Sequence, residues 1–282
     1  MIIAGVQMDV TLGNVDANVE TMTSRLTETV SNGARLTIFP ECAATGYCFE
    51  SLDEARPFAE PIPGAITERM AAACLQRETF AIFGLLEADS EAVYNTVVLT
   101  GPQGFLASYR KVHLPFLSVD MFTTYGDRPF AVHDAGGLKV GMNICYDAAF
   151  PEGARAMAIL GADLIALPTN WPPGAECFAE YAINTRAMEN NVYYAAVNRV
   201  GTERGCTFIG RSRICAPSGE TLAAGSADCE EILYAEVDPA TARNKRVVRV
   251  PGKHAIDRLA DRRPEMYRLL TQPHELERPG GR

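Results

Sequence analysis

The sequence has no long hydrophobic run, no overall excess of basic residues and no cluster of closely spaced cysteines. No apolar stretch reaches the ~18 residues that a membrane-spanning helix needs, so we expect no membrane partner. The net charge of −9 is opposite in sign to that of a phosphate-binding surface and disfavours nucleic acid as a partner. The N-terminal segment has no basic region and reaches Asp9 early, which is not the pattern of a signal peptide. We therefore expect a cytoplasmic protein without a nucleic-acid or membrane partner.

The eight cysteines are spread over the whole chain, and no two have the C-x-x-C spacing of a zinc site. They are too few for a disulfide scaffold in a chain of 282 residues. We expect no metal site and reduced thiols, one of which is available as a nucleophile.

Short apolar runs alternate with longer segments of helical periodicity, which predicts a layered α/β fold. The expected strands are Ile2–Met8, Leu36–Phe39, Phe80–Leu86, Thr96–Thr100, Lys139–Ile144, Leu164–Leu167, Tyr193–Val197 and Ile232–Val237. The expected helices are Asn18–Asn32, Ala65–Arg77, Gly153–Leu160 and Phe178–Asn191.

Two turn-forming segments, Gly101–Gly104 and Ala216–Glu220, predict β-hairpins and therefore sheets of mixed strand direction. No linker divides the chain, so we expect one domain over residues 1–282. Residues 240–282 contain eleven Lys or Arg against five Asp or Glu, whereas residues 1–239 have a net charge of −15. We expect this basic tail to dock on the body of the protein or on a partner subunit.

Three residues with reactive side chains, Glu41, Lys111 and Cys145, each follow the end of a β-rich run. Ligand sites of open α/β sheets form at such strand ends. A neutral thiol needs a base, which Glu41 can supply, and Lys111 can hold that carboxylate and stabilise an oxyanion. Asp147 is expected to cap a helix that begins near Pro151, and the N-terminus of that helix would favour a Cys145 thiolate.

These segments resemble the nitrilase superfamily of carbon–nitrogen hydrolases, which is marked by a Glu–Lys–Cys triad. The resemblance extends over nearly the whole chain. It rests also on Thr45–Tyr47, Phe150–Glu152, Pro168–Trp171, Arg186–Asn190, Asn198–Gly201, Gly210–Ser212 and Arg262–Glu265.

The resemblance implies a four-layer αββα sandwich, a homodimer or higher homo-oligomer, and no metal or organic cofactor. It also implies that Cys145 attacks the substrate carbon and that Glu41 acts as base and acid. Lys111 and the backbone N–H of Tyr146 would hold the developing oxyanion.

Two departures from the family pattern concern the site. Many members carry a further glutamate after the lysine, where this chain has Asp120 nine residues on, which either replaces that glutamate or caps a loop. The nucleophile is followed by Tyr146-Asp147, whereas true nitrilases tend to have Trp-Glu. This difference resembles amidases and carbamoylases.

Other residues near these motifs have alternative interpretations. Tyr47, Phe116 and Asn170 are candidates for substrate binding, and Trp171 either walls the pocket or fills the core. The remaining expectations are that Cys42 packs away from the site, as it would in an extended chain, that His113 makes a structural hydrogen bond, and that Arg186 pairs with Glu189.

The leading hypothesis is an amidase that releases ammonia from a small carboxamide through a thioester. The closest alternative is an N-carbamoyl amine or amino acid amidohydrolase, for which Arg128 or Arg199 could bind a carboxylate. A nitrilase, an acyltransferase and a non-catalytic binding protein are further alternatives.

Overall fold

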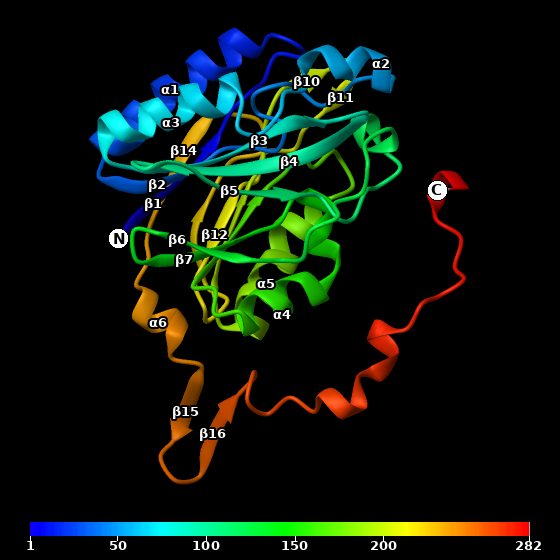
Figure 1. Ribbon diagram of the computed structural model, residues 1–282. Coiled ribbons are helices and arrows are strands. Elements are labelled where there is room, and N and C mark those ends of the chain that lie inside the picture. Colours follow the sequence, from blue (N-terminus) through cyan, green and yellow to red (C-terminus); the bar gives the residue numbers. More distant parts are fainter. Residues whose placement is uncertain (282) are drawn as a thin grey trace.

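The computed structural model describes residues 1–281, which form two six-stranded mixed sheets packed face to face between two pairs of helices (Figure 1). The first sheet has the order β14-β1-β2-β3-β4-β5 and the second has the order β13-β12-β9-β8-β7-β6. The strands of the first sheet are β1 Ile2–Gln7, β2 Ala34–Ile38, β3 Phe80–Asp89, β4 Ala92–Gly101, β5 Gly104–Arg110 and β14 Glu231–Glu236. Those of the second are β6 Val132–Ala135, β7 Leu138–Met142, β8 Leu164–Pro168, β9 Tyr193–Val197, β12 Arg213–Cys215 and β13 Thr221–Ala224.

Each sheet has three parallel strands at its centre, β1-β2-β3 in the first and β7-β8-β9 in the second. The strands that flank them are antiparallel, and both predicted hairpins are confirmed as β4–β5 and β12–β13. The two sheets approach closely at Gly5, where an added Cβ would lie 2.9 Å from a methyl carbon of Val197.

Helices α1 (Val15–Ser31) and α3 (Ala65–Arg77) cover the outer face of the first sheet, and α4 (Pro151–Ile159) and α5 (Ile183–Asn190) cover that of the second (Figure 1). The apolar faces of α1 and α3 pack in one cluster with residues of β1 and β3, because their buried residues recur at helical spacing. The four-layer αββα sandwich expected from the sequence is therefore confirmed.

The remaining elements are short: α2 Leu52–Ala55, α6 Pro239–Arg243, the two-residue strands β10 Thr202–Glu203 and β11 Cys206–Thr207, and the hairpin β15 Arg246–Val250 with β16 His254–Asp257. A turn of π-helix at Phe178–Ala182 precedes α5. None of the helices within residues 1–281 is long and apolar enough to cross a membrane.

The C-terminal segment leaves the sandwich after α6 and then curves back beside it toward the C-terminus (Figure 1). Its beginning is tied to the second sheet, because Arg243 forms an ion pair with Asp163 at 2.7 Å. Near its end, Arg278 lies over the ring of Tyr125. Most side chains from Arg246 onward are exposed.

Candidate active site

The three residues of the expected triad lie where strands of both sheets end. Glu41 follows β2, and Lys111 directly follows β5. Cys145 begins a 3₁₀ turn, Cys145–Ala149, after β7 of the second sheet. The Glu41 segment stays close to β3, since the Gly84 N–H donates to the Pro40 carbonyl and a Cβ at Gly84 would lie 2.3 Å from the Cys42 nitrogen.

A buried ammonium group is bound between two carboxylates. The Nζ atom of Lys111 lies 2.6 Å from Oε1 of Glu41 and 2.5 Å from Oδ2 of Asp120, and all three side chains are fully buried. The hydroxyl of Tyr47 donates to the same Asp120 oxygen at 2.8 Å. Asp120 is therefore part of the cluster around Lys111, as the replacement for the additional glutamate requires.

Asn95 of β4 is a member of this cluster that the sequence did not single out. Its Nδ2 atom donates to Oε1 of Glu41 at 2.7 Å and to Oδ1 of Asp120 at 2.9 Å. The expected strand began one residue later, at Thr96, so Asn95 was assigned to no element. The signal that could have found it is an asparagine within an apolar β-rich run, since Asn is depleted in strands.

The two oxygens of Glu41 differ in their surroundings. Oε1 accepts from Lys111 and Asn95, whereas Oε2 is buried and has no hydrogen-bond partner within residues 1–281. Burial raises the pKa of Glu41, and the nearby charge of Lys111 only partly opposes this. Burial lowers the pKa of Lys111, but the charges of Asp120 and Glu41 outweigh it and hold that pKa well above its usual value.

Cys145 has a backbone conformation that is rare for a residue with a side chain. Its φ of 44° lies in the left-handed region, which costs about 1–3 kcal/mol and is found most often at functional sites. Burial raises the pKa of the thiol to about 12, the charge of Glu41 adds to the rise, and Lys111 opposes it. The thiol therefore stays protonated at neutral pH unless a neighbouring group accepts its proton.

Asp147 has a different role from the predicted helix cap, and that prediction is wrong. Helix α4 is preceded by Phe150, which makes no side-chain cap, while Asp147 turns back toward the nucleophile. Its Oδ2 accepts from the Ile144 N–H and the Tyr109 hydroxyl, at 2.9 and 2.8 Å. Its Oδ1 accepts from the backbone N–H of His113 at 3.1 Å and lies 2.7 Å from the ring Nδ1 of the same residue.

This carboxylate thus joins the backbone that precedes Cys145 to the segment that follows Lys111. The structural hydrogen bond predicted for His113 is confirmed as its contact with Asp147. The ring of His113 also stacks on Phe150 at 3.8 Å.

Cys42 is buried, but the geometric reason given for its orientation is wrong. Its φ of 47° is not that of an extended chain, because the backbone turns sharply after Glu41. The Sγ atom lies 3.6 Å from Oδ1 of Asn95, on the opposite end of that amide from the two carboxylates. Burial, the largest effect, raises the pKa of this thiol well above its ordinary value.

The five residues proposed for substrate binding differ in exposure. Tyr47, Asn170 and Trp171 are buried, and Tyr146 and Phe116 are 41% and 55% exposed. Both polar atoms of the Asn170 side chain are buried without a hydrogen-bond partner among the described residues. Phe116 lies against the backbone of Gly280, near the C-terminus.

Arginines that could bind a substrate carboxylate are placed unfavourably for that role. Arg199 is fully buried and pairs with Asp9 and Glu203, both at 2.8 Å. Arg128 is exposed and donates to Ser108. The predicted pair of Arg186 and Glu189 is confirmed at 2.9 Å.

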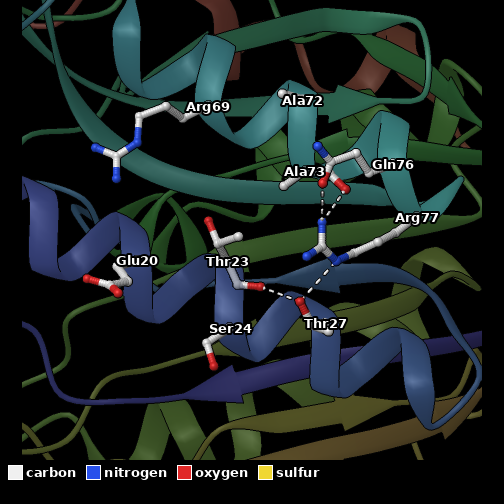
Figure 2. A pocket seen from close by; sticks show the side chains of 9 residues that line it. All are labelled: Glu20, Thr23, Ser24, Thr27, Arg69, Ala72, Ala73, Gln76 and Arg77. Atoms are coloured by element: carbon white, nitrogen blue, oxygen red, sulfur yellow. Dashed lines mark hydrogen bonds between the residues drawn. The ribbon is translucent and has the colours of Figure 1, made fainter.

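A groove of about 630 Å³ between α1 and α3 lies apart from these residues (Figure 2). It is lined by polar side chains such as Thr23 and Thr27, and Arg77 donates to the Thr27 hydroxyl at 2.9 Å. None of the triad residues lines it.

Comparisons with known proteins agree with this geometry. The carbon–nitrogen hydrolase family profile matches residues 2–247. A nitrilase of Pyrococcus abyssi is 39% identical over 94% of this chain and 98% of its own. The omega-amidase of Homo sapiens is 31% identical over 78% of this chain and 83% of its own.

Among solved structures, a cysteine-to-alanine variant of an amidase from Nesterenkonia sp. AN1, in complex with butyramide, has a TM-score of 0.79 at 25% identity. The match covers 95% of this chain and 96% of that one. The protein belongs to the carbon–nitrogen hydrolase family, the nitrilase superfamily. Its Glu41, Lys111 and Cys145 are consistent with the family's Glu–Lys–Cys triad.

Proposed function

We propose that this protein hydrolyses small primary carboxamides to the acid and ammonia through a thioester on Cys145. The observation that carries the proposal is the fully buried Lys111 ammonium, bound to Glu41 and Asp120. The charges of Glu41 and Lys111 both affect the pKa of the Cys145 thiol, which supports a single site formed by the three groups.

In the first half-reaction, Glu41 takes the thiol proton as Sγ of Cys145 attacks the amide carbon. The oxyanion of the tetrahedral intermediate is held by Lys111 and the backbone N–H of Tyr146. Glu41 then returns the proton to the nitrogen, the C–N bond breaks and ammonia leaves the thioester.

In the second half-reaction, water attacks the thioester carbon and Glu41 accepts a proton from it. The C–S bond breaks, and the thiolate regains a proton as the acid departs. These steps use no metal and no organic cofactor.

Asp120 has a supporting role in this proposal. Its two oxygens accept from Asn95, Lys111 and Tyr47, so it serves as the lasting counter-ion of the ammonium. The proposed substrate-binding residues are Tyr47, Phe116, Tyr146, Asn170 and Trp171.

A small aliphatic or aromatic acyl group fits this site better than an anionic one, because Arg199 is already paired with two carboxylates. The related amidase that binds butyramide supports the same class. The alternative is cleavage of carbamoyl compounds. Those that carry a carboxylate would need a cation in the site, and Arg128 would have to supply it.

The proposal is tested by measuring ammonia release from small carboxamides, carbamoyl compounds and nitriles. We expect carboxamides to be turned over and nitriles to be at least 100-fold slower in kcat/KM, a difference of about 2.7 kcal/mol. Turnover of carbamoyl compounds alone would favour the alternative, and hydroxamate formation with hydroxylamine would reveal acyl transfer.

We also propose that the chain forms a homodimer or larger homo-oligomer in the cytoplasm. The C-terminal segment exposes apolar side chains, including Met266, Leu269 and Leu270, and its basic charge complements an acidic body. The cysteines described by the structure are all free thiols, as a reducing compartment requires.

A further inference from the structure

Asn95 is buried in the carboxylate cluster, and both polar atoms of its side chain have hydrogen-bond partners. The two hydrogens on Nδ2 are directed to Glu41 and Asp120, at 2.7 and 2.9 Å, and Oδ1 faces the Cys42 thiol. The orientation of the amide is therefore fixed, because a flipped amide would place its oxygen against two carboxylates.

The position of Asn95 follows from the first sheet. Strand β4 pairs with both β3 and β5, and the Asn95 carbonyl accepts the backbone N–H of Lys111 at 2.9 Å. The neighbouring Thr96 makes a comparable bond, from its hydroxyl to the buried carboxylate of Glu87 at 2.8 Å. Adjacent residues of a strand face opposite sides of the sheet, so these two bonds lie on opposite faces.

The two carboxylates that Asn95 contacts differ in how many of their oxygens accept hydrogen bonds. Asp120 receives hydrogen bonds on both oxygens, from Asn95 on one and from Lys111 and Tyr47 on the other. Glu41 receives them only on Oε1, and Oε2 has no partner within the described part of the chain. One carboxylate is thus satisfied, while the other presents a single buried oxygen that can accept a proton.

We propose that Asn95 is a positioning residue that fixes Glu41 through Oε1, leaves Oε2 as the oxygen that takes the Cys145 proton, and holds Asp120 as the counter-ion of Lys111. This inference rests on the proposed role of Glu41 as the base. It adds a residue that touches neither substrate nor nucleophile and acts through both carboxylates.

The test is the pH dependence of Cys145 alkylation by iodoacetamide, followed by mass spectrometry of the Cys145 peptide. This readout needs the thiolate but no turnover of an amide. Asn95→Leu removes both N–H donors at nearly constant volume. The Glu41 carboxylate then loses one hydrogen bond, which should raise its pKa. We expect the acid limb of alkylation to move up by about one pH unit. With a carboxamide at pH 7, kcat should fall about tenfold and KM should change less than threefold.

Thr96→Val is the matched control, because it removes a hydrogen bond to a buried carboxylate from the same strand on the other face. It should leave the acid limb in place. If Asn95→Leu does not fold, Asn95→Ser, which retains one short donor, should shift the limb in the same direction.

A folded Asn95 variant with an unmoved acid limb would overturn the inference. Failure of both Asn95 variants to fold while Thr96→Val folds would also overturn it and assign Asn95 to stability alone. Glu41→Gln separates the two proposals: if it leaves the alkylation profile unchanged, the proposed base is wrong. If it abolishes the acid limb and Asn95→Leu does not move it, only the role of Asn95 fails.

Discussion

At the scale of single residues, the site combines groups that would be costly to bury alone. Removing one partner of a buried ion pair leaves an uncompensated charge and costs about 3–5 kcal/mol. Lys111 avoids this cost through Glu41 and Asp120, and each carboxylate is further stabilised by Asn95. In the proposed mechanism this cluster supplies both a fixed positive charge and the proton acceptor for Cys145.

Lys111→Met should reduce kcat far more than it changes KM, because a donor to the oxyanion acts mainly in the transition state. The loss of one such donor is about 3 kcal/mol, or roughly 100-fold or more in kcat. Steady-state kinetics with a carboxamide measures this, with the exposed Lys139→Met as the control. A Lys111 variant within tenfold of the original enzyme would remove this residue from the mechanism.

Asp120→Ala should lower kcat at least tenfold. The ammonium of Lys111 then loses one of its two counter-ions, and the Tyr47 hydroxyl loses its acceptor. Steady-state kinetics at several pH values measures the loss of kcat. Circular dichroism shows whether the variant is still folded. Unchanged kinetics would show that Asp120 does not replace the family's additional glutamate.

The pH profile should have an acid limb set by Glu41 and a plateau above it. Burial raises the pKa of Glu41, so as pH falls through that raised value the carboxylate gains a proton and can no longer accept one from Cys145. Burial raises the pKa of the Cys145 thiol to about 12, so this thiol ionises at too high a pH to contribute to the acid limb. The raised pKa of Lys111 keeps the ammonium charged through the neutral and mildly alkaline range, so kcat/KM should stay level there.

This profile is measured as kcat/KM against pH for a neutral amide. A rise in kcat/KM that follows thiol ionisation on the alkaline side would contradict base catalysis by Glu41.

At the scale of elements, the nucleophile is held by a 3₁₀ turn rather than by the N-terminus of α4. Asp147 shapes this turn, since it accepts the Ile144 N–H just before Cys145 and the His113 N–H from the segment after Lys111. The left-handed backbone of Cys145 persists because these contacts fix the chain on its N-terminal side and link it to the opposite sheet.

Asp147→Asn should therefore impair both stability and activity. The asparagine presents one N–H₂ group where two backbone N–H groups and the Tyr109 hydroxyl now donate, so at least one buried donor loses its acceptor, at a cost of about 1–3 kcal/mol. Thermal unfolding and kcat should both fall, kcat by about tenfold or more.

The matched control is Asp134→Asn, at an exposed position of β6 where the carboxylate accepts the Gly137 N–H. Unaltered stability and kcat in Asp147→Asn would refute the positioning role of Asp147.

At the scale of the whole molecule, the periodicity of the sequence predicts the layers well because buried parallel strands are continuous apolar runs. Tyr193–Val197 and Ala65–Arg77 were predicted with the bounds that the structure has. The short edge strand β6 was missed, and β13 was predicted only as one arm of a hairpin without bounds, since their half-exposed residues lack a distinctive pattern.

The site could be predicted only in part for a related reason. The triad residues lie at strand ends, where spacing along the chain marks them. The contacts of Asn95 and Asp147 depend on how separate strands and turns meet, and no local pattern specifies this. The sharp turn at Cys42 is likewise set by the tertiary structure, through the close approach of Gly84.

The most direct test of the central claim is acid-quenched mass spectrometry of the enzyme during turnover of a small carboxamide. The account predicts an acyl adduct on the peptide that contains Cys145, and loss of both adduct and ammonia release in Cys145→Ala. Cys42→Ala, which removes another buried thiol, should retain most activity. Ammonia release by Cys145→Ala, or an acyl adduct on Cys42 in its place, would contradict the account.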